Sequence, residues 1–189
     1  DGCFIAEFDG VPVGTVSTTS YGTKLAWIGM MLVLPEYRRR GIASQLIQKS
    51  IDYLCERGVT CVKLDATPSG QPLYEQLGFL AEWGFQRWER EGENVPTFLL
   101  DGDLSAQLVA MDEVAFGADR SCWLISVASD CRVFTSQSTF GMLRPGSGAT
   151  YLGPVVSEEP SQVASIVREM LSIAEGRVFW DIPTGHELS

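Results

Sequence analysis

The sequence predicts an α/β protein in which a mixed central sheet is flanked by helices, and in which this arrangement occurs twice in tandem. Strand-length apolar runs alternate with segments of helical spacing, and the element order of the first half recurs in the second. The 189 residues suffice for one large or two small domains. A composition that is 45% hydrophobic and 20% charged provides enough apolar surface for a buried core and excludes a disordered chain.

The first half has the pattern of three strands, a helix, a fourth strand and a short helix. The dipeptide Asp9-Gly10 is a strong hairpin signal, and a loop rich in Ser, Thr and Gly is expected at 18–23. The unbroken apolar sequence AWIGMMLVL then indicates a central strand buried on both faces. Apolar residues at helical spacing follow, ending at Gly58. The expected strands are 3–8, 11–17, 26–34 and 59–64, with one or two more in 79–89, and the expected helices start at about residue 41 and span 71–77.

A charged segment that contains Pro96 separates the halves and is expected to be a linker. The second half predicts helices at 104–116, 120–128 and 161–174, and strands at 131–136, 139–144, 150–156 and 178–182. Two unrelated α/β units are the alternative to a repeat. If the repeat holds, each copy lacks elements at one end, so we expect an internal piece of a longer protein. The expected domains are 1–90 and 104–189, with the linker at 91–103.

Composition also limits the partners and the compartment. The net charge of -10 argues against nucleic acid and anionic membranes, and no apolar run is long enough to span a bilayer. Five cysteines without CxxC spacing and one histidine, His186 near the chain end, predict no metal site, and the cysteines are expected to be buried free thiols. No signal-peptide pattern is present, so a cytoplasmic location is expected.

Three consecutive arginines, Arg38, Arg39 and Arg40, precede the first long helix. The backbone N–H groups of a first helical turn favour phosphate, and arginine adds charge-assisted hydrogen bonds. Gly41 and Ala43 would let a ligand approach the backbone. On its own the run could be a solvated helix start, but its position after a buried strand favours an anion site. Neither a Walker loop nor GxGxxG is present.

With these residues the sequence resembles the GCN5-related N-acetyltransferases, the GNAT superfamily. Arg38-x-x-Gly41-x-Ala43 is similar to the motif that binds the pyrophosphate of acetyl-CoA, and Tyr74-x-x-x-Gly78-Phe79 is similar to a second family signature downstream. The resemblance covers about residues 3 to 90 and implies the GNAT fold.

The resemblance also implies roles for individual residues. Tyr74 would protonate the departing CoA thiolate as a general acid. The alternative is a helix residue that packs on the core. Thr67 stands where many family members have Asn, which should weaken one contact. The general base is not identified, and Glu7, Asp9 and Asp65 do not stand out as candidates. The residues implied in cofactor binding are Met31, Leu32 and Val33 along the pantetheine arm, Arg38, Arg39, Arg40, Gly41, Ile42, Ala43 and Ser44 around the pyrophosphate, and Thr67.

The second half resembles the degenerate C-terminal domain of tandem members of this superfamily. With Ala164 aligned to Ala43, the acidic Glu158 and Glu159 fall where a phosphate seat should be basic, so no CoA is expected there. Asp119 and Arg120 either border an acceptor pocket or serve as a helix cap and a surface charge.

We therefore expect an acetyl-CoA-dependent N-acetyltransferase that uses CoA as a co-substrate and no metal. The acetyl group would pass directly to a small-molecule or peptide amine, whose identity and whose binding pocket the sequence does not give. A non-catalytic acyl-CoA-binding or interaction module is the alternative. A nucleotide-phosphate binder is disfavoured because the P-loop lysine is absent.

Overall fold

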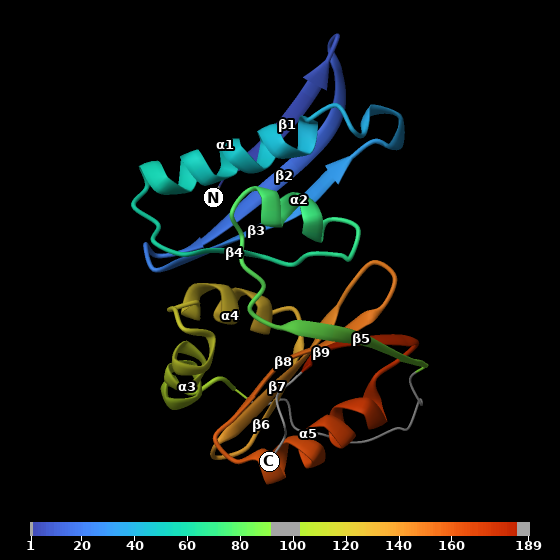
Figure 1. Ribbon diagram of the computed structural model, residues 1–189. Coiled ribbons are helices and arrows are strands. Elements are labelled where there is room, and N and C mark those ends of the chain that lie inside the picture. The colour runs from blue at the N-terminus through green and yellow to red at the C-terminus, as the bar shows by residue number, and fades with distance from the viewer. Residues whose placement is uncertain (1, 92–102, 185–189) are drawn as a thin grey trace. The chain divides into compact units, whose positions relative to one another are not determined.

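A computed structural model describes residues 2–91 and 103–184 (Figure 1). The chain divides into two compact units, with the division between Ala81 and Glu82. Most of the predicted linker, residues 92–102, and the histidine His186 lie outside the described residues.

The first unit contains a four-stranded sheet in the order β1-β2-β3-β4. The first three strands are antiparallel neighbours, and β4 joins β3 in parallel. Asp9 and Gly10 form the β1–β2 turn with positive φ angles of 50° and 78°, as the hairpin signal predicts. The strands are β1 (Cys3–Phe8), β2 (Val11–Tyr21), β3 (Leu25–Val33) and β4 (Val62–Leu64).

Helix α1 (Ile42–Glu56) covers one face of this sheet and forms the core of the unit. Its apolar residues recur at helical spacing, so Leu46, Ile47 and Leu54 all point toward the strands. A short 3₁₀ helix (Pro35–Tyr37) precedes α1, and α2 (Gln71–Gln76) follows β4. The buried cluster consists of Val16, Ala26, Ile28, Leu46, Ile47, Leu54 and Val59.

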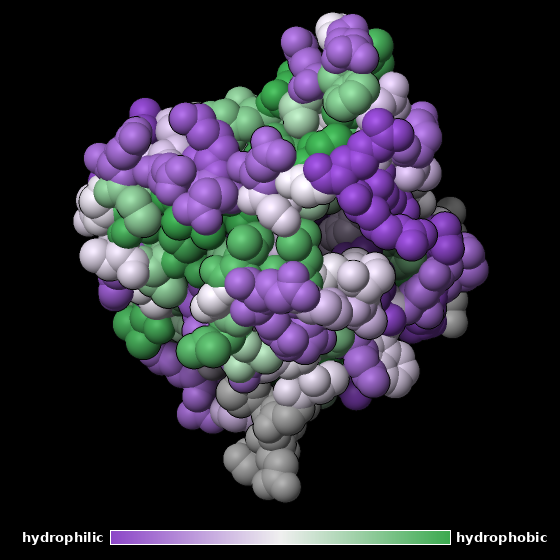
Figure 2. Space-filling model, turned by 45° about the horizontal axis from the view of Figure 1, so that its top comes forward, coloured by the Kyte–Doolittle hydropathy of each residue, from purple (hydrophilic) through white to green (hydrophobic). Residues whose placement is uncertain are grey.

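Two expectations for these strands are wrong. The segment 18–21, predicted as loop, continues β2, because β-branched threonines suit an extended strand. β3 is not buried on both faces, because the side chains of Met30 and Leu32 are 68% and 59% exposed. Exposed apolar side chains are not confined to β3, since Figure 2 shows apolar patches between polar ones on one face of the molecule.

The second unit contains a five-stranded sheet in the order β5-β9-β8-β7-β6, with helices on both faces. Helices α3 and α4 pack on one face around Leu124 and Phe140, and α5 packs on the other around Leu152 and Met170. The strands are β5 (Gly84–Glu91), β6 (Arg132–Thr135), β7 (Thr139–Pro145), β8 (Thr150–Ser157) and β9 (Arg177–Thr184). The helices are α3 (Ala106–Phe116), α4 (Ser121–Ala128) and α5 (Pro160–Ile173).

The strand directions of the two sheets match. β6, β7 and β8 are antiparallel neighbours and β9 joins β8 in parallel, as in the series β1 to β4. Each sheet also has a β-bulge at the same place, with Met30-Met31 opposite Val16 in the first and Gly153-Pro154 opposite Met142 in the second. A shared bulge at a shared position supports an internal repeat over two unrelated units.

Strand β5 belongs to the second unit, whereas the sequence suggested that it closes the first domain. All eight of its residues pair with β9, from Gly84 opposite Thr184 to Glu91 opposite Arg177. The strand therefore belongs to the sheet of the second unit, although the sequence groups it with the first 90 residues.

The cysteines are unpaired, as expected, but none is buried. Cys3, Cys55 and Cys122 are exposed, and Cys61 and Cys131 are half-buried. Within the described ranges, no helix is long and apolar enough to cross a membrane. The same ranges contain no cluster of three or more His, Cys, Asp or Glu side chains that could hold a metal ion.

Candidate functional site

The loop that joins β3 to α1, residues 34–41, has an unusual backbone. Its 3₁₀ turn ends at Tyr37, and two left-handed residues follow, Arg39 with φ 59° and Gly41 with φ 76°. Gly41 is the N-cap residue of α1, and no side chain caps the helix there. Left-handed residues in a turn can point neighbouring N–H groups toward one side, as in the concavities that bind anions.

Hydrogen bonding leaves this concavity available to a ligand. Arg38 donates its backbone N–H to the carbonyl of Pro35 at 3.3 Å, and Gln45 donates to Gly41 at 3.1 Å. Between them, the six backbone N–H groups of residues 39–44 have no acceptor in the part of the chain that the structure describes. Six consecutive free donors at the positive end of a fifteen-residue helix form a site for an anion with several oxygens.

Two of the three arginine side chains build the loop. The guanidinium of Arg38 donates through Nε to the carbonyl of Val33 at 3.0 Å. That of Arg40 donates to the carbonyl of Glu36 at 3.4 Å and lies over the rings of Phe8 and Tyr37, at 5.4 and 5.2 Å. Arg39, which is exposed, has no such contact with a described residue. The loop therefore offers six free backbone donors, and two of the three guanidinium groups that the sequence suggested as donors already bond to carbonyl groups.

β3 and β4 separate immediately before this loop. They pair only from Ala26 to Ile28, opposite Val62 to Leu64, and β3 then continues alone on that side to Val33. The predicted pantetheine-binding residues, Met31, Leu32 and Val33, lie in this unpaired stretch. They thus border an opening between two parallel strands, where an extended ligand could pair with the edge of β3.

The bulge at the start of the opening is held by hydroxyl groups of β2. Thr15 Oγ1 donates to the carbonyl of Met30 at 3.0 Å, and Ser17 Oγ donates to the carbonyl of Gly29 at 3.2 Å. Met30 itself has a positive φ of 51°. Sequence reasoning did not single out these hydroxyl groups, since Ser and Thr are common in strands and carry no motif.

Tyr74 lies on α2 and is half-buried in the same apolar cluster as Met31 and Ile42. Its ring meets Phe79 edge to face at 6.2 Å. The hydroxyl has no hydrogen bond to a described residue. Burial raises the pKa of this phenol above its usual value of 10, so it carries its proton at neutral pH. The packing role and the acid role are therefore compatible.

Thr67 is occupied within its own turn. Its carbonyl accepts the N–H groups of Gly70 and Gln71, each at 2.9 Å, and its hydroxyl shares a hydrogen bond with Ser69 at 3.1 Å. These contacts shape the turn that leads into α2. A hydroxyl already bonded to Ser69 is a weaker candidate for a cofactor contact than the backbone donors of residues 39–44.

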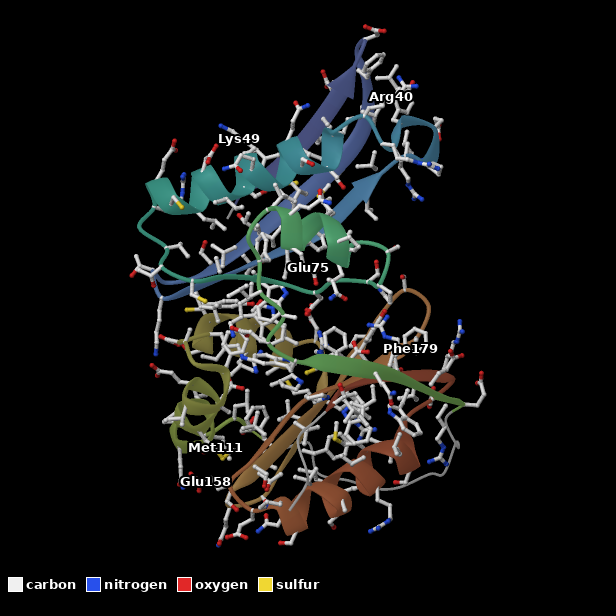
Figure 3. All side chains as sticks on the ribbon, viewed as in Figure 1. Arg40, Lys49, Glu75, Met111, Glu158 and Phe179 are labelled. Carbon is white, nitrogen blue, oxygen red and sulfur yellow. The ribbon has the colours of Figure 1, made fainter. Side chains whose placement is uncertain are left out.

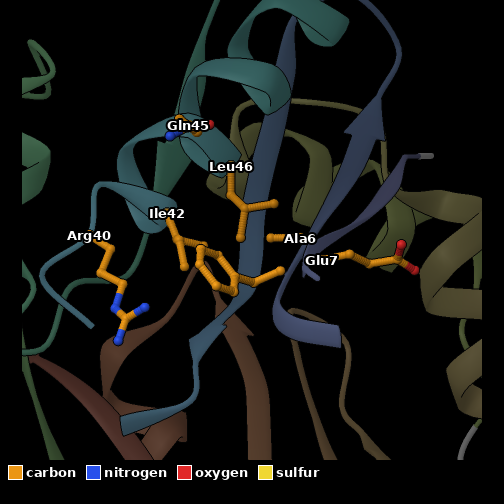
Figure 4. Close-up of a pocket in the computed structure, with 7 residues that line it drawn as sticks. Ala6, Glu7, Arg40, Ile42, Gln45 and Leu46 are labelled. Atoms are coloured by element: carbon orange, nitrogen blue, oxygen red, sulfur yellow. The ribbon is translucent and has the colours of Figure 1, made fainter. Parts of the chain in front are cut away.

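A separate pocket of about 380 Å³ lies between β1 and the first turns of α1 (Figure 4). Ala6, Glu7 and Phe8 line it from β1, and Arg40, Ile42, Gln45 and Leu46 line it from the loop and helix. Its lining does not include Met31, Leu32 or Val33, but Arg40 and Ile42 also belong to the segment with the free N–H groups. Sequence reasoning did not find it, because its residues come from two distant segments without a common motif.

The corresponding junction of the second unit is short. Only Glu158 and Glu159 separate β8 from α5 (Figure 3). The N–H of Glu159 donates to Ser157 Oγ at 3.0 Å, and the N–H of Gln162 donates to the carbonyl of Glu159 at 2.9 Å. Because α5 already starts at Pro160, Gln162 is inside the helix and is not the counterpart of Gly41. This junction has acidic side chains and lacks the row of free donors.

Asp119 and Arg120 have structural contacts within the second unit. Asp119 Oδ1 accepts the N–H of Ser121, the first residue of α4, at 2.8 Å. Hydrogen bonds from the side chain and then the backbone of Ser121 lower the pKa of Asp119. Arg120 is not a surface charge, because its guanidinium donates to both carboxylate oxygens of buried Asp112 at 2.7 Å. Asp112 lies on α3, and the sequence alone did not identify it as the partner of Arg120.

Comparison with known proteins identifies both units. The model of the GNAT acetyltransferase family matches residues 1–79, and that of a GNAT acetyltransferase domain matches residues 108–188. The uncharacterized N-acetyltransferase YitH of Bacillus subtilis is 28% identical over 177 residues, which cover 86% of this chain and 62% of that protein. The N-alpha-acetyltransferase MAK3 of Arabidopsis thaliana is 37% identical over 84 residues, which cover 41% of this chain and 44% of the relative.

Solved structures agree with this family. A protein from Pyrococcus horikoshii that is named as an acetyltransferase superposes with a TM-score of 0.80 and 25% identity, covering 95% of this chain and 63% of that one. A second such protein, from Thermoplasma acidophilum, has a TM-score of 0.66 at 16% identity and covers 96% of this chain and 70% of its own, which shows the same fold. The chain spans less than two thirds of the length of the Bacillus and Pyrococcus proteins.

Proposed function

The chain belongs to the GNAT acetyltransferase superfamily, and we propose that its first unit transfers the acetyl group of acetyl-CoA to an amine on a small molecule or a peptide. The observation that carries this proposal is the row of six free backbone N–H groups at residues 39–44. A pyrophosphate offers several anionic oxygens on two neighbouring phosphorus atoms and matches such a row. The arm attached to it would then follow β3 along Met31–Val33.

Acetyl-CoA supplies the activated thioester, and the residues of this chain bind it and handle one proton. The amine nitrogen attacks the thioester carbonyl and forms the amide bond as the carbon–sulfur bond breaks. Tyr74 gives its phenolic proton to the departing thiolate, and the proton lost by the amine nitrogen passes to water, which can return one to Tyr74. A phenol that burial keeps protonated suits this role. No cysteine takes part, because the transfer is direct.

The second unit is proposed to be catalytically inactive. Its β8–α5 junction has two acidic residues, and the N–H groups of Glu159 and Gln162 there already bond to Ser157 Oγ and to the carbonyl of Glu159. A pyrophosphate would meet like charge and would lack donors at this point. The proposed activity therefore uses one CoA per chain.

Calorimetric titration with CoA and acetyl-CoA tests the binding half of the proposal, and release of free thiol with a panel of primary amines tests the transfer half. Binding at one site per chain together with amine-dependent thiol release is the expected result. Binding without turnover on any amine would favour the alternative, an acyl-CoA-binding module. If ATP competes with CoA on equal terms, the site recognises phosphate in general and the proposal of a CoA site is wrong.

A further inference from the structure

The second unit contains a series of arginine side chains that alternate with aromatic rings. The guanidinium carbon of Arg120 lies 5.3 Å from the ring of Trp123, and that of Arg144 lies 5.8 Å from the same ring. Arg144 also lies 5.9 Å from the ring of Tyr151, which Arg87 approaches from 6.0 Å. Trp123 comes from α4, Arg144 from β7 and Tyr151 from β8, so three elements meet at Arg144.

The charges of this series do not balance. Arg120 is paired with Asp112 through two bonds of 2.7 Å, and Arg87 is paired with Asp181 through bonds of 2.8 and 2.6 Å. Arg144 has no carboxylate partner among the residues that the structure describes. Its single hydrogen bond there is from Nε to the carbonyl of Gly153, at 2.6 Å. Three cations and two anions leave one positive charge, at Arg144.

This surplus charge is partly removed from water. Arg144 is half-buried, and burial lowers the pKa of its guanidinium, as does the nearby charge of Arg120. The carboxylate of Asp181 opposes this shift from a distance, but its hydrogen bonds go to Arg87. The adjacent Cys131 does not supply a counter-charge, because burial raises the pKa of its thiol and keeps it neutral at pH 7. A half-buried cation that no carboxylate contacts directly is an unfavourable arrangement that a bound anion would relieve.

The geometry favours a carboxylate over a phosphate. Gly153 occupies Nε, so the two Nη groups of Arg144 remain, and their spacing matches the two oxygens of one carboxylate. A single negative charge balances the surplus, whereas a phosphate dianion would exceed it. The rings of Trp123 and Tyr151 offer apolar surface to the rest of the ligand.

We propose that Arg144, flanked by Trp123 and Tyr151, binds the carboxylate of a small organic acid whose apolar or aromatic body lies against the two rings. The site is built entirely from the second unit and does not depend on acetyl transfer by the first. It gives the unit that lacks the anion-binding loop a ligand of its own.

Benzoate is the probe, with benzamide as its neutral analogue and inorganic phosphate as the competing anion, all at constant ionic strength in chloride. We expect benzoate to bind the full chain at one site and benzamide not to bind. Arg144→Gln should weaken benzoate binding about tenfold or more, as loss of a charge-assisted bond predicts. Arg168→Gln, which removes an exposed cation on α5, should leave it unchanged.

Equal benzoate affinity in the wild type and in Arg144→Gln would overturn the proposal, as would tighter binding of phosphate than of benzoate. If Arg144→Gln does not fold, the wild type decides. The indole N–H resonance of Trp123, assigned by its loss in Trp123→Phe, must shift with benzoate and not with benzamide. A resonance that responds to neither compound refutes the site.

Discussion

Replacement of Gly41 by alanine separates the conformational requirement of the loop from its binding role. Gly41 has φ 76°, and a Cβ built there would meet nothing closer than 3.9 Å, the Nε2 atom of Gln45. The substitution therefore causes backbone strain without a clash. Holding an L-residue in the left-handed region costs about 1–2 kcal/mol, and 1 kcal/mol corresponds to a fall in Tm of about 4–8 °C for a domain of 60–100 residues.

Gly58 provides a matched control at the other end of the same helix. Its φ is 74°, and its nearest neighbour to an added Cβ is Thr23 Cγ2 at 4.0 Å. Gly58→Ala should therefore lower Tm by about as much as Gly41→Ala. The affinity for CoA should fall in Gly41→Ala and stay unchanged in Gly58→Ala, because relaxation of residue 41 turns the N–H groups of its neighbours away from the pyrophosphate. Loss of one charge-assisted hydrogen bond, worth about 1.5–3 kcal/mol, raises the Kd for CoA about tenfold to hundredfold.

Scanning calorimetry measures the Tm of each variant, and isothermal titration measures its Kd for CoA. The reasoning is refuted if the two variants bind CoA with the same affinity, because the loop backbone would then not be what recognises the ligand. It is also refuted if Gly41→Ala is as stable as the wild type, since the left-handed conformation would then carry no strain.

Two further predictions concern side chains. Tyr74→Phe should lower kcat about tenfold or more with little change in the KM for acetyl-CoA, because general-acid catalysis contributes at least that much. Since burial raises the pKa of Tyr74 above 10, the wild-type rate should fall only above that pH. A Tyr74→Phe variant with the wild-type rate and the same fall in rate at high pH would contradict the acid role. Asp112→Ala should destabilise the second unit by about 3–5 kcal/mol because it leaves Arg120 partly buried without its partner. Denaturant titration measures the free energy of unfolding, and replacement of the exposed Asp130 by alanine is the control, with an expected change near zero. Equal changes in the two variants would show that the Asp112–Arg120 pair does not stabilise the fold.

Local patterns predicted the elements of this fold well and their surroundings less well. The helix over Ile42–Glu56 follows from apolar spacing, and the hairpin at Asp9-Gly10 follows from turn chemistry. The apolar run around Met30 suggested burial on both faces, but an apolar residue is not required to be buried. Which of these side chains are buried depends on the helix that packs on one face of β3 and on the separation of β3 from β4. The apolar run alone predicts neither.

Strand pairing shows the same limit over a longer range. The alternation in β5 predicts a strand, but its partner β9 starts 86 positions after the end of β5 in the sequence, counting from Glu91 to Arg177. Pairing at that separation depends on the assembled sheet, because the local pattern of a strand is compatible with many neighbours. The same holds for Asp112 and Arg120, which the spacing along the chain does not identify as a pair.

The anion-binding loop illustrates what the motif does and does not specify. Arg38-x-x-Gly41-x-Ala43 predicts an anion site here, yet Arg38 bonds to the carbonyl of Val33 at the end of β3 and Arg40 bonds to the carbonyl of Glu36 in the loop. These two arginine side chains therefore help to hold the backbone in which the N–H groups of residues 39–44 stay free. That distinction could not come from residue types, because a guanidinium is an equally good donor to a carbonyl and to a phosphate.

The two units show how the length of one junction changes the role of a helix end. In the first, eight residues join β3 to α1, which leaves room for a 3₁₀ turn and for left-handed residues at 39 and 41, and six N–H groups stay free. In the second, two residues join β8 to α5, and the hydroxyl of Ser157 bonds the N–H of Glu159. The same strand, bulge and helix thus leave a row of free N–H groups only in the unit with the longer loop. The short junction already lacks that row of donors, and the acidic residues at 158 and 159 add negative charge that would disfavour a phosphate further.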